Sequence, residues 1–380
     1  MNEREKMDGA GISIPVADPL IGEEEAKAVY DAVRSGWVRE GILTAKFEKM
    51  FADYTKSKHA VATSSGTTAL HAAMLCLGLK PGDEVIVPSL TCIPPVSAAL
   101  LCGAVPVFAD IETETYNIDP GAVEAAITGK TKMIIPINYG GHPAELAELE
   151  KIANNHGIIL LNDMAEALGA KVGNKNAAEF GQLSIYSFSP NKTITTGEGG
   201  MVTTNDAALA EKIRRVKDYG QNGRFNYAEL GSNYHFTEMQ AAMGIEQMKK
   251  IDKVVKRKRD AAKLMTEKLG DIKQLKLPVE KEGYTHAYML YTVRILDSKI
   301  KNKMRREDVM KRLELAGIQS RVYFPPLHES ELLKKSKSRV SSKKNIDAVA
   351  GSLLSLPSSP KLTEEQINHI AKTMKEIFRI

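Results

Sequence analysis

The chain has 380 residues, of which 43% are hydrophobic and 26% are charged, and its formal net charge at pH 7 is +5. This composition is typical of a globular protein, and the length suggests two or three domains, since single cores stop growing at roughly 250–300 residues. The charge is too mild to indicate a nucleic-acid partner. The basic run at 334–344 (KKSKSRVSSKK) is more typical of a solvated loop, although a nucleic-acid or membrane contact is the alternative.

The cysteines and apolar segments exclude further classes. Cys76, Cys92 and Cys102 form no CxxC pair and no cysteine–histidine ligand spacing, so we expect no metal site. A sparse, odd cysteine count suits a reducing compartment, and the stretch 1–13 lacks the apolar core of a signal peptide, so we expect a cytoplasmic protein. The longest apolar region, 93–109, is too short and too interrupted by prolines for a membrane span, and we expect no membrane partner.

In the first two-thirds of the chain, strand and helix patterns alternate. Helices are predicted over 21–35, 65–79, 94–102 and 144–157. Seven strands, the second opened by a turn, are predicted at 59–64, 81–89, 104–110, 132–139, 158–163, 183–188 and 199–205. Such alternation with short connections favours a mostly parallel sheet with helices on both faces.

The rest of the chain has a different pattern. A helical zone at 206–269 is interrupted by the polar, glycine-rich stretch 219–233. One strand and two helices follow, at 286–296, 304–317 and 362–378. We therefore place a large domain at 1–255 and a smaller α+β domain at 256–380.

Two segments suggest a binding site at the carboxyl ends of the strands. SSGTTAL (64–70) joins a strand to a helix, and the free amides and hydroxyls of such a turn can bind an anion, although a plain helix cap is the alternative. Asp163 ends the apolar strand IILLND, where a carboxylate can face a ligand in an open α/β sheet. The alternative for Asp163 is an N-cap of a helix in the residues that follow.

Two later segments carry further candidates. SFSPNKTITTGEGGM (187–201) surrounds Lys192 with small and hydroxyl residues, so its amine can serve as nucleophile and base, and Ser187 can donate to a phosphate. Taken alone, Lys192 is more often a surface lysine, and the segment has no GxGxxG dinucleotide fingerprint. The segment LGSNYHFTEMQAAMG (230–244) begins with a loop that carries Asn233 and continues into a predicted helix.

The order and spacing of these segments resemble the DegT/DnrJ/StrS sugar aminotransferase family, which has the aspartate-aminotransferase fold. The resemblance covers nearly the whole chain, and so many ordered motifs make a chance match very improbable. Its motifs are SGWVREGILTAKFEKMFADY (35–54), VATSSGTTALHAAML (61–75), PGDEVIVPSLT (81–91), PVFADIETETYNIDP (106–120), INYGGHPAEL (137–146), NDMAEALGA (162–170), SFSPNKTITTGEGGMVTT (187–204), GIQSRVYFPPLHES (317–330) and LSLPSSPKLTEEQ (354–366).

The resemblance implies the fold and the cofactor. It implies an α/β fold of the PLP-dependent transferase fold type I, with a mostly parallel seven-stranded sheet flanked by helices and a smaller α+β C-terminal domain. It implies that Lys192 carries pyridoxal 5'-phosphate (PLP) as a Schiff base and later moves the proton. Asp163 would pair with the pyridine nitrogen, and the phosphate would be held by Gly66, Thr67 and Ser187.

Further residues are carried over from the same motifs. Glu166 stands where relatives place a polar residue near the cofactor ring. Asn233 would reach the phosphate of the partner subunit, which implies a homodimer with composite active sites. Tyr323 and His328 lie in a motif that is near the sugar nucleotide in relatives.

Two positions depart from the family pattern. Cys92 stands where many members have an aromatic residue that stacks on the cofactor ring, so a thiol would have to make that contact. His235 in NYHFT replaces the arginine of the common NYRMT, which puts any charge contact of that arginine in doubt.

The implied reaction is ping-pong transamination. L-glutamate is the expected amino donor and a nucleotide-linked keto-sugar the acceptor, giving an amino sugar for polysaccharide, glycan or related biosynthesis. A PLP-dependent sugar dehydratase on the same fold is one alternative, but relatives of that kind commonly replace the lysine with histidine. A regulatory or binding protein without turnover is the other, and the presence of both Lys192 and Asp163 disfavours it.

Overall fold

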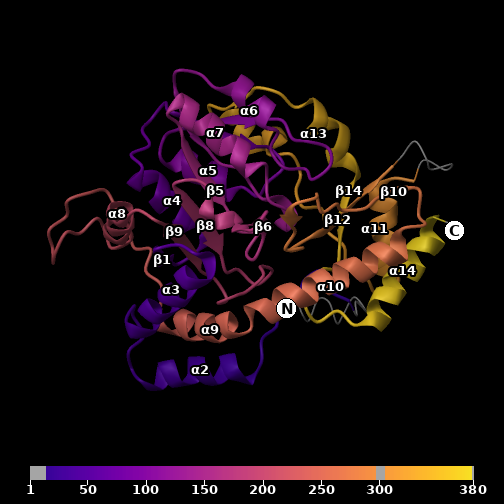
Figure 1. The fold of residues 1–380 in the computed structure, drawn as a ribbon, viewed down its shortest axis with the longest axis horizontal. Helices are drawn as coiled ribbons and strands as arrows, with labels where there is room; N and C mark the ends of the chain where they lie inside the picture. Colours follow the sequence, from indigo (N-terminus) through magenta and orange to yellow (C-terminus); the bar gives the residue numbers. More distant parts are fainter. Residues whose placement is uncertain (1–13, 297–303, 379–380) are drawn as a thin grey trace.

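The computed structural model describes residues 14–296 and 304–378, and its centre is a mostly parallel sheet (Figure 1). Five of the seven neighbouring strand pairs are parallel, and β9 pairs antiparallel with both β8 and β1. In sheet order, the strands are β1 (His59–Thr63), β9 (Gly200–Thr204), β8 (Leu183–Ser187), β5 (Ile159–Asp163), β4 (Thr131–Ile134), β2 (Glu84–Pro88), β3 (Val105–Ala109) and β13 (Arg339–Val340). The first seven are the strands expected from the sequence.

The eighth strand comes from the basic run, which was expected to be a loop. Arg339 and Val340 pair in parallel with Val107 and Phe108 at the edge of the sheet. The Arg339 guanidinium also donates to the carbonyl of Ala126 at 2.8 Å. The solvated-loop prediction was therefore wrong at these two residues, because a two-residue edge strand held by backbone pairing needs no apolar periodicity. Helices α12 (Glu331–Lys335) and α13 (Lys344–Val349) flank it.

Helices cover both faces of the sheet. One face packs on α4, α5 and α8, and the other on α3, α6, α7 and α9, each over its own apolar core. The helices are α2 (Glu23–Arg34), α3 (Ile42–Thr55), α4 (Gly66–Cys76), α5 (Pro94–Leu101), α6 (Pro120–Ala126), α7 (Leu146–His156), α8 (Ala207–Lys217) and α9 (Glu238–Lys249), with 3₁₀ turns at Tyr139–Gly141, Ala177–Glu179, Leu327–Glu329 and Ala350–Ser352. This is the expected layering, and the strands between the layers are almost wholly buried.

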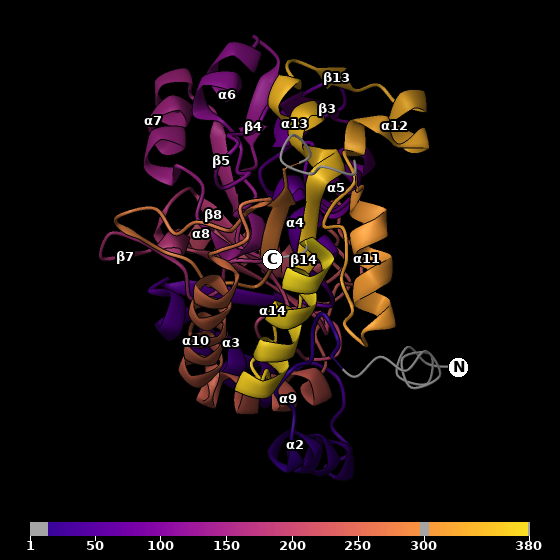
Figure 2. The same cartoon turned by 90° about the vertical axis from the view of Figure 1, so that its right-hand side faces the viewer.

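The C-terminal part forms a second, smaller layer of sheet and helices (Figure 2). A third core lies between its sheet and α10, α11 and α14. The elements are α10 (Ile251–Leu269), β10 (Leu275–Lys276), β12 (Tyr291–Ile295), α11 (Arg306–Leu315), β14 (Leu353–Leu356) and α14 (Glu364–Phe378), while β6 (Lys171–Val172), β7 (Lys175–Asn176) and β11 (Tyr284–Thr285) form a separate small sheet. None of the helices in the described part of the chain combines the length and the apolar character that a membrane span requires.

Helix α10 connects the two parts, and the division expected after residue 255 falls inside it (Figure 1). At the other end of the chain, Ile14 pairs with Ile318, so the first described residues lie against the C-terminal part. The strand predicted over 286–296 is also shorter than expected, because only Tyr291–Ile295 is extended. Residues 286–290 instead turn away and pair with the turn at 139–141.

Gly200 allows the start of β9 to lie against the beginning of α4. A Cβ atom at Gly200 would lie 2.2 Å from the carbonyl oxygen of Ser65 and 2.8 Å from the amide nitrogen of Gly66. We expect Gly200→Ala to lower the free energy of unfolding by about 3 kcal/mol, because backbone atoms would have to move. Gly129→Ala is the matched control, since a Cβ there meets nothing within 4 Å. Equal denaturant midpoints for the two variants would contradict this packing argument.

Candidate active site

A cavity of about 250 Å³ lies at the carboxyl ends of the central strands. Its walls come from the beginning of α4, the loop after β2, the ends of β5 and β8, and the loop that carries Lys192. This is where ligands bind in open α/β sheets. The residues expected from the sequence that line it are Gly66, Thr67, Cys92, Asp163, Glu166, Ser187 and Lys192.

The first turn of α4 presents free amides to the cavity. Ser65 is the N-cap, and its side chain accepts a hydrogen bond from the amide of Thr68 at 3.1 Å. The amides of Gly66 and Thr67 precede the intrahelical pairing and border the cavity. A Cβ at Gly66 would lie only 2.8 Å from the Cβ of Ser187, so glycine lets the Ser187 hydroxyl approach these amides. Two amides, a hydroxyl and the helix dipole make a site suited to a phosphate.

Asp163 ends β5 and is only 4% exposed. Its Oδ1 accepts a hydrogen bond from the amide of Ala165 at 2.9 Å. Burial raises the pKa of this carboxyl to about 7, although the Ala165 amide and the charge of Lys192 act in the opposite direction. Residues 164–170 form turns, so the alternative of a helix N-cap is wrong. A buried carboxylate of this kind is stabilised by a protonated ring nitrogen, which fits the pyridine of PLP.

Lys192 points into the cavity, so the alternative of a surface lysine is wrong. Its side chain is 14% exposed, and Nζ lies 3.7 Å from Oε1 of Glu166. The other Glu166 oxygen accepts a hydrogen bond from the amide of Gly140 at 2.8 Å, and the sulfur of Met289 lies 3.9 Å from Nζ. The amine therefore has one nearby carboxylate to orient it and a largely apolar wall on another side.

The loop that carries Lys192 is held by its own backbone. Phe188 donates to the carbonyl of Gly199 at 2.8 Å, and its carbonyl accepts hydrogen bonds from Thr195 and Thr196. The Phe188 ring packs edge-on against Phe47 and Phe51 of α3. The threonines and glycines of the motif thus close a loop around one aromatic anchor, and this closure turns Lys192 inward.

Asn233 and His235 lie outside this cavity. Asn233 is exposed, and its side-chain oxygen accepts a hydrogen bond from the amide of His235 at 3.3 Å. The His235 ring lies between two carboxylates, 3.0 Å from Glu40 and 2.9 Å from Asp218. Burial raises the pKa of Glu40, but hydrogen bonds and charge from His235 and Lys217 outweigh it and hold the pKa at about 2. The histidine at the position of the family arginine therefore contacts two carboxylates of its own chain.

Tyr323 and His328 also do not line the cavity. The Tyr323 carbonyl accepts a hydrogen bond from the Tyr139 hydroxyl, while its neighbour Phe324 forms part of the cavity wall. The His328 side chain is 6% exposed, with Nδ1 2.7 Å from the Ser89 hydroxyl and Nε2 3.6 Å from Asp347. The structure thus places the motif beside the cavity but brings only Phe324 to its surface.

Several lining residues had not been expected. They are Ser65, Leu70, Thr91, Pro94, Pro95, Ile137, Ala165, Ile185, Ser189, Asn191, Glu198 and Phe324. Most lie within a few residues of a predicted site residue, so the same motifs could have indicated them. Met289 does not line the cavity but lies beside the Lys192 amine. It belongs to residues 286–290, which were expected to be part of a strand, and no motif marks it.

The mostly parallel sheet with a lysine-bearing cavity at its carboxyl edge is the architecture of PLP-dependent transferases of fold type I. More particularly, the chain belongs to the DegT/DnrJ/EryC1/StrS aminotransferase family, which matches residues 19–375. The protein is thus a PLP-dependent aminotransferase, and the expected family, fold and cofactor are confirmed.

Similar proteins cover almost the same length. The GDP-perosamine synthase of Vibrio cholerae is 35% identical over 368 residues, which are 96% of this chain and 99% of that protein. The spore coat polysaccharide biosynthesis protein SpsC of Bacillus subtilis is 32% identical over 96% of this chain and 97% of its own. The solved PLP form of the putative sugar aminotransferase Spr1654 of Streptococcus pneumoniae has a TM-score of 0.90 and 26% identity, covering 96% of this chain and 98% of that one.

The raised pKa of Asp163 predicts a pH-dependent stability of the cofactor-free protein. Between the unfolded pKa of about 3.9 and the folded value of about 7, the folded chain holds a proton that the unfolded chain has released. Unfolding free energy should therefore fall as pH rises through this window, relative to Asp163→Asn, by on the order of 2–4 kcal/mol. Denaturant titrations at pH 4.5 and 7.5 measure the difference, and a gap independent of pH would refute the assignment.

Proposed function

We propose that the protein transfers an amino group from L-glutamate to a nucleotide-linked keto-sugar, giving an amino sugar for polysaccharide or glycan biosynthesis in the cytoplasm. The observation that carries this proposal is the convergence of Lys192, Asp163 and the first turn of α4 on one cavity. The names of the perosamine synthase and of the spore coat polysaccharide protein support the sugar substrate and the biosynthetic role.

Different residues around the cavity would bind different parts of the cofactor. The amides of Gly66 and Thr67 and the hydroxyl of Ser187 would bind the phosphate. Asp163 would keep the ring nitrogen protonated, because the two groups neutralise each other in a buried site. Bound PLP supplies an electron sink for the charge that develops when a proton leaves the carbon next to the amino group. Cys92 lines the same cavity and can contact the ring with its thiol.

Lys192 would be the acid–base group of both half-reactions. Its amine takes the proton from the α-carbon of glutamate, and in the second half-reaction it moves the proton at the sugar carbon in the opposite direction. Glu166, 3.7 Å away, would orient the amine by charge. The placement of a lysine rather than a histidine here favours transamination over the dehydratase alternative.

A homodimer would complete the site with Asn233 of the other subunit. Asn233 is exposed and lies outside the cavity of its own chain, so it is available to a partner. An apolar hollow of about 650 Å³ between α2, α3 and α9 supports a second copy as that partner. Two large apolar side chains that line it are exposed, Trp37 (63%) and Ile42 (85%). A patch of this kind marks an interaction surface in a water-soluble fold.

The role of Lys192 can be tested by substitution. We expect the purified protein to be yellow, to bleach with glutamate, and to be labelled at Lys192 after borohydride reduction. Lys192→Ala should lower turnover by at least about a thousandfold, because both proton transfers lose their base. Lys49→Ala, on the exposed side of α3, is the control.

The same assay tests the substrates. Keto-sugar nucleotides are supplied with glutamate, and the product is identified by mass and NMR. Full turnover in Lys192→Ala would remove this residue from the mechanism. A wild-type protein that takes PLP but aminates none of the keto-sugar nucleotides would contradict the proposed acceptor.

Mixing two inactive variants tests the composite site. In a statistical mixture of Lys192→Ala and Asn233→Ala, half of the dimers are mixed, and each of these has one site with both residues intact. Turnover should therefore recover to roughly a quarter of wild type. Each variant incubated alone is the control. No recovery, with subunit exchange verified by mass, would mean that both residues act within one chain.

A further inference from the structure

A turn behind Glu166 connects the cavity to the C-terminal part of the chain. The amide of Gly140 donates to Glu166, and its carbonyl accepts from the amide of Leu290 at 2.9 Å. The carbonyl of Gly141 accepts from Ala287, also at 2.9 Å. The turn is therefore clamped between the loop of Glu166 and residues 286–290, which also carry Met289 to the amine of Lys192.

Gly141 is packed closely between two backbone segments. This residue has a φ of +104°, and a Cβ there would lie 3.0 Å from the Glu166 carbonyl and 3.0 Å from the amides of Tyr288 and Met289. Because backbone meets backbone on both sides, a shift of residues 286–290 must move the turn, and the turn must move Glu166. The position of Glu166 and Met289 thus depends on what holds residues 286–290.

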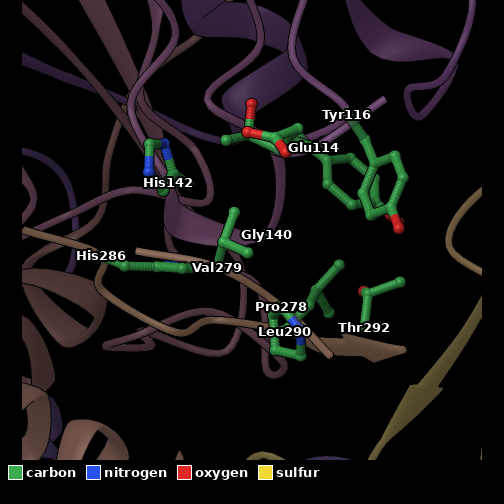
Figure 3. A pocket seen from close by; sticks show the side chains of 11 residues that line it. Glu114, Tyr116, Gly140, His142, Pro278, Val279, His286, Leu290 and Thr292 are labelled. Carbon is green, nitrogen blue, oxygen red and sulfur yellow. The ribbon is translucent and has the colours of Figure 1, made fainter. Parts of the chain in front are cut away.

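Two buried histidines lie beside one another here, His286 at the start of this segment and His142 just after the turn (Figure 3). His286 and His142 are 4% and 1% exposed, and their rings lie 5.4 Å apart, edge to face. The amide of Tyr288 donates to Nδ1 of His286 at 2.9 Å, and the rings of His286 and Tyr288 stack with their centroids 3.9 Å apart. Nε2 of His142 accepts from the amide of Lys281 at 3.2 Å. Both rings and Gly140 border a small cavity of about 20 Å³, room for one water.

Both imidazoles must be neutral to accept these hydrogen bonds from backbone amides. A ring nitrogen that accepts from a backbone amide cannot carry a proton, so protonation would replace a hydrogen bond with a repulsive contact. Burial lowers the pKa of both rings, that of His286 to well below its usual value. The charged and titratable groups that face the pair are Arg259, Glu280, Tyr288, Lys281, Tyr284, Glu112, Glu145 and Glu114. Most of these charges are already paired with one another, as in Arg259–Glu280 and Lys281–Glu145.

We propose that His286, supported by His142, is a positioning residue for the transamination. In its neutral form, its Nδ1 accepts from the amide of Tyr288 and so fixes the bend of residues 286–290. That bend lets the backbone of the segment pair with the turn at 139–141, which sets Glu166 and Met289 around the amine of Lys192. The proposal rests on the role proposed above for Lys192. The atom responsible for this positioning is Nδ1 of His286, which accepts the hydrogen bond from the amide of Tyr288.

Two substitutions at one position test this acceptor. His286→Asn keeps an acceptor near the place of Nδ1, whereas His286→Leu removes it. We expect the leucine variant to lose about 10- to 100-fold in kcat with little change in KM for glutamate, since misplacement affects proton transfer more than binding. The asparagine variant should stay within about threefold of wild type. His156→Leu, at a partly exposed position on α7, is the matched control.

A measurement independent of turnover accompanies the kinetics. The folded pKa of His286 lies below the unfolded value of about 6.5, so stability falls as pH drops, when the unfolded chain takes up a proton that the folded one cannot. The denaturant midpoint of the wild type should therefore fall more between pH 7.5 and 5.5 than that of His286→Asn.

The outcomes separate this proposal from the proposed function. A folded leucine variant with wild-type kcat, or an asparagine variant as impaired as the leucine one, overturns it. If the leucine variant does not fold, an asparagine variant with the full acid sensitivity of the wild type overturns it as well. Failure of the proposed function would instead leave wild-type protein inactive with glutamate while the midpoint difference persists.

Discussion

The close approach of α4 to the ends of β8 and β9 is the constraint on which the site depends. Gly66 and Gly200 remove the two Cβ atoms that would otherwise meet Ser187 and Ser65 at 2.8 and 2.2 Å. Without this contact, the first amides of α4 and the Ser187 hydroxyl would not face the same volume. The proposed phosphate site is thus a consequence of packing between a helix end and two strand ends, and its donors are largely backbone atoms that the fold holds in place.

Charge balance is the second determinant of the cavity. Asp163 and Glu166 are both nearly buried, and Lys192 is the cation within ion-pair distance of Glu166. In the cofactor-free chain, burial raises the pKa of Asp163 to about 7, because the ionised carboxylate is poorly solvated there. A ligand with a protonated ring nitrogen stabilises the ionised carboxylate, and the phosphate of such a ligand would lie at the positive end of α4. The cavity therefore favours a ligand with a cation at one end and an anion at the other.

Much of this site could be predicted because its residues lie at the ends of strands or directly after them. Asp163 and Ser187 end β5 and β8, and the Lys192 loop follows at once, so a parallel sheet brings them together without further information. What could not be predicted depends on pairing between distant segments. Val340 adds to β3 from a lysine-rich run, and residues 286–290 leave their strand because Gly140 and Gly141 offer them partners. His328 lies behind the cavity wall because Ser89 holds its ring there.

Residues 286–290 are also where three parts of the chain meet. They continue into β12 of the C-terminal sheet, they pair with the turn at 139–141, and the carbonyl of Met289 faces Lys258 of α10 at 3.4 Å. Lys258 is 3% exposed and donates to the carbonyl of Ser358 at 2.7 Å, and burial lowers its pKa to about 7. Burying an ammonium against carbonyls is costly, so the fold gives up stability to tie α10 and the C-terminal loop to the segment that contacts Lys192. The C-terminal part is therefore coupled to the Lys192 amine through backbone atoms. A change in its packing should shift Lys192 before it shifts the proposed phosphate site at the start of α4.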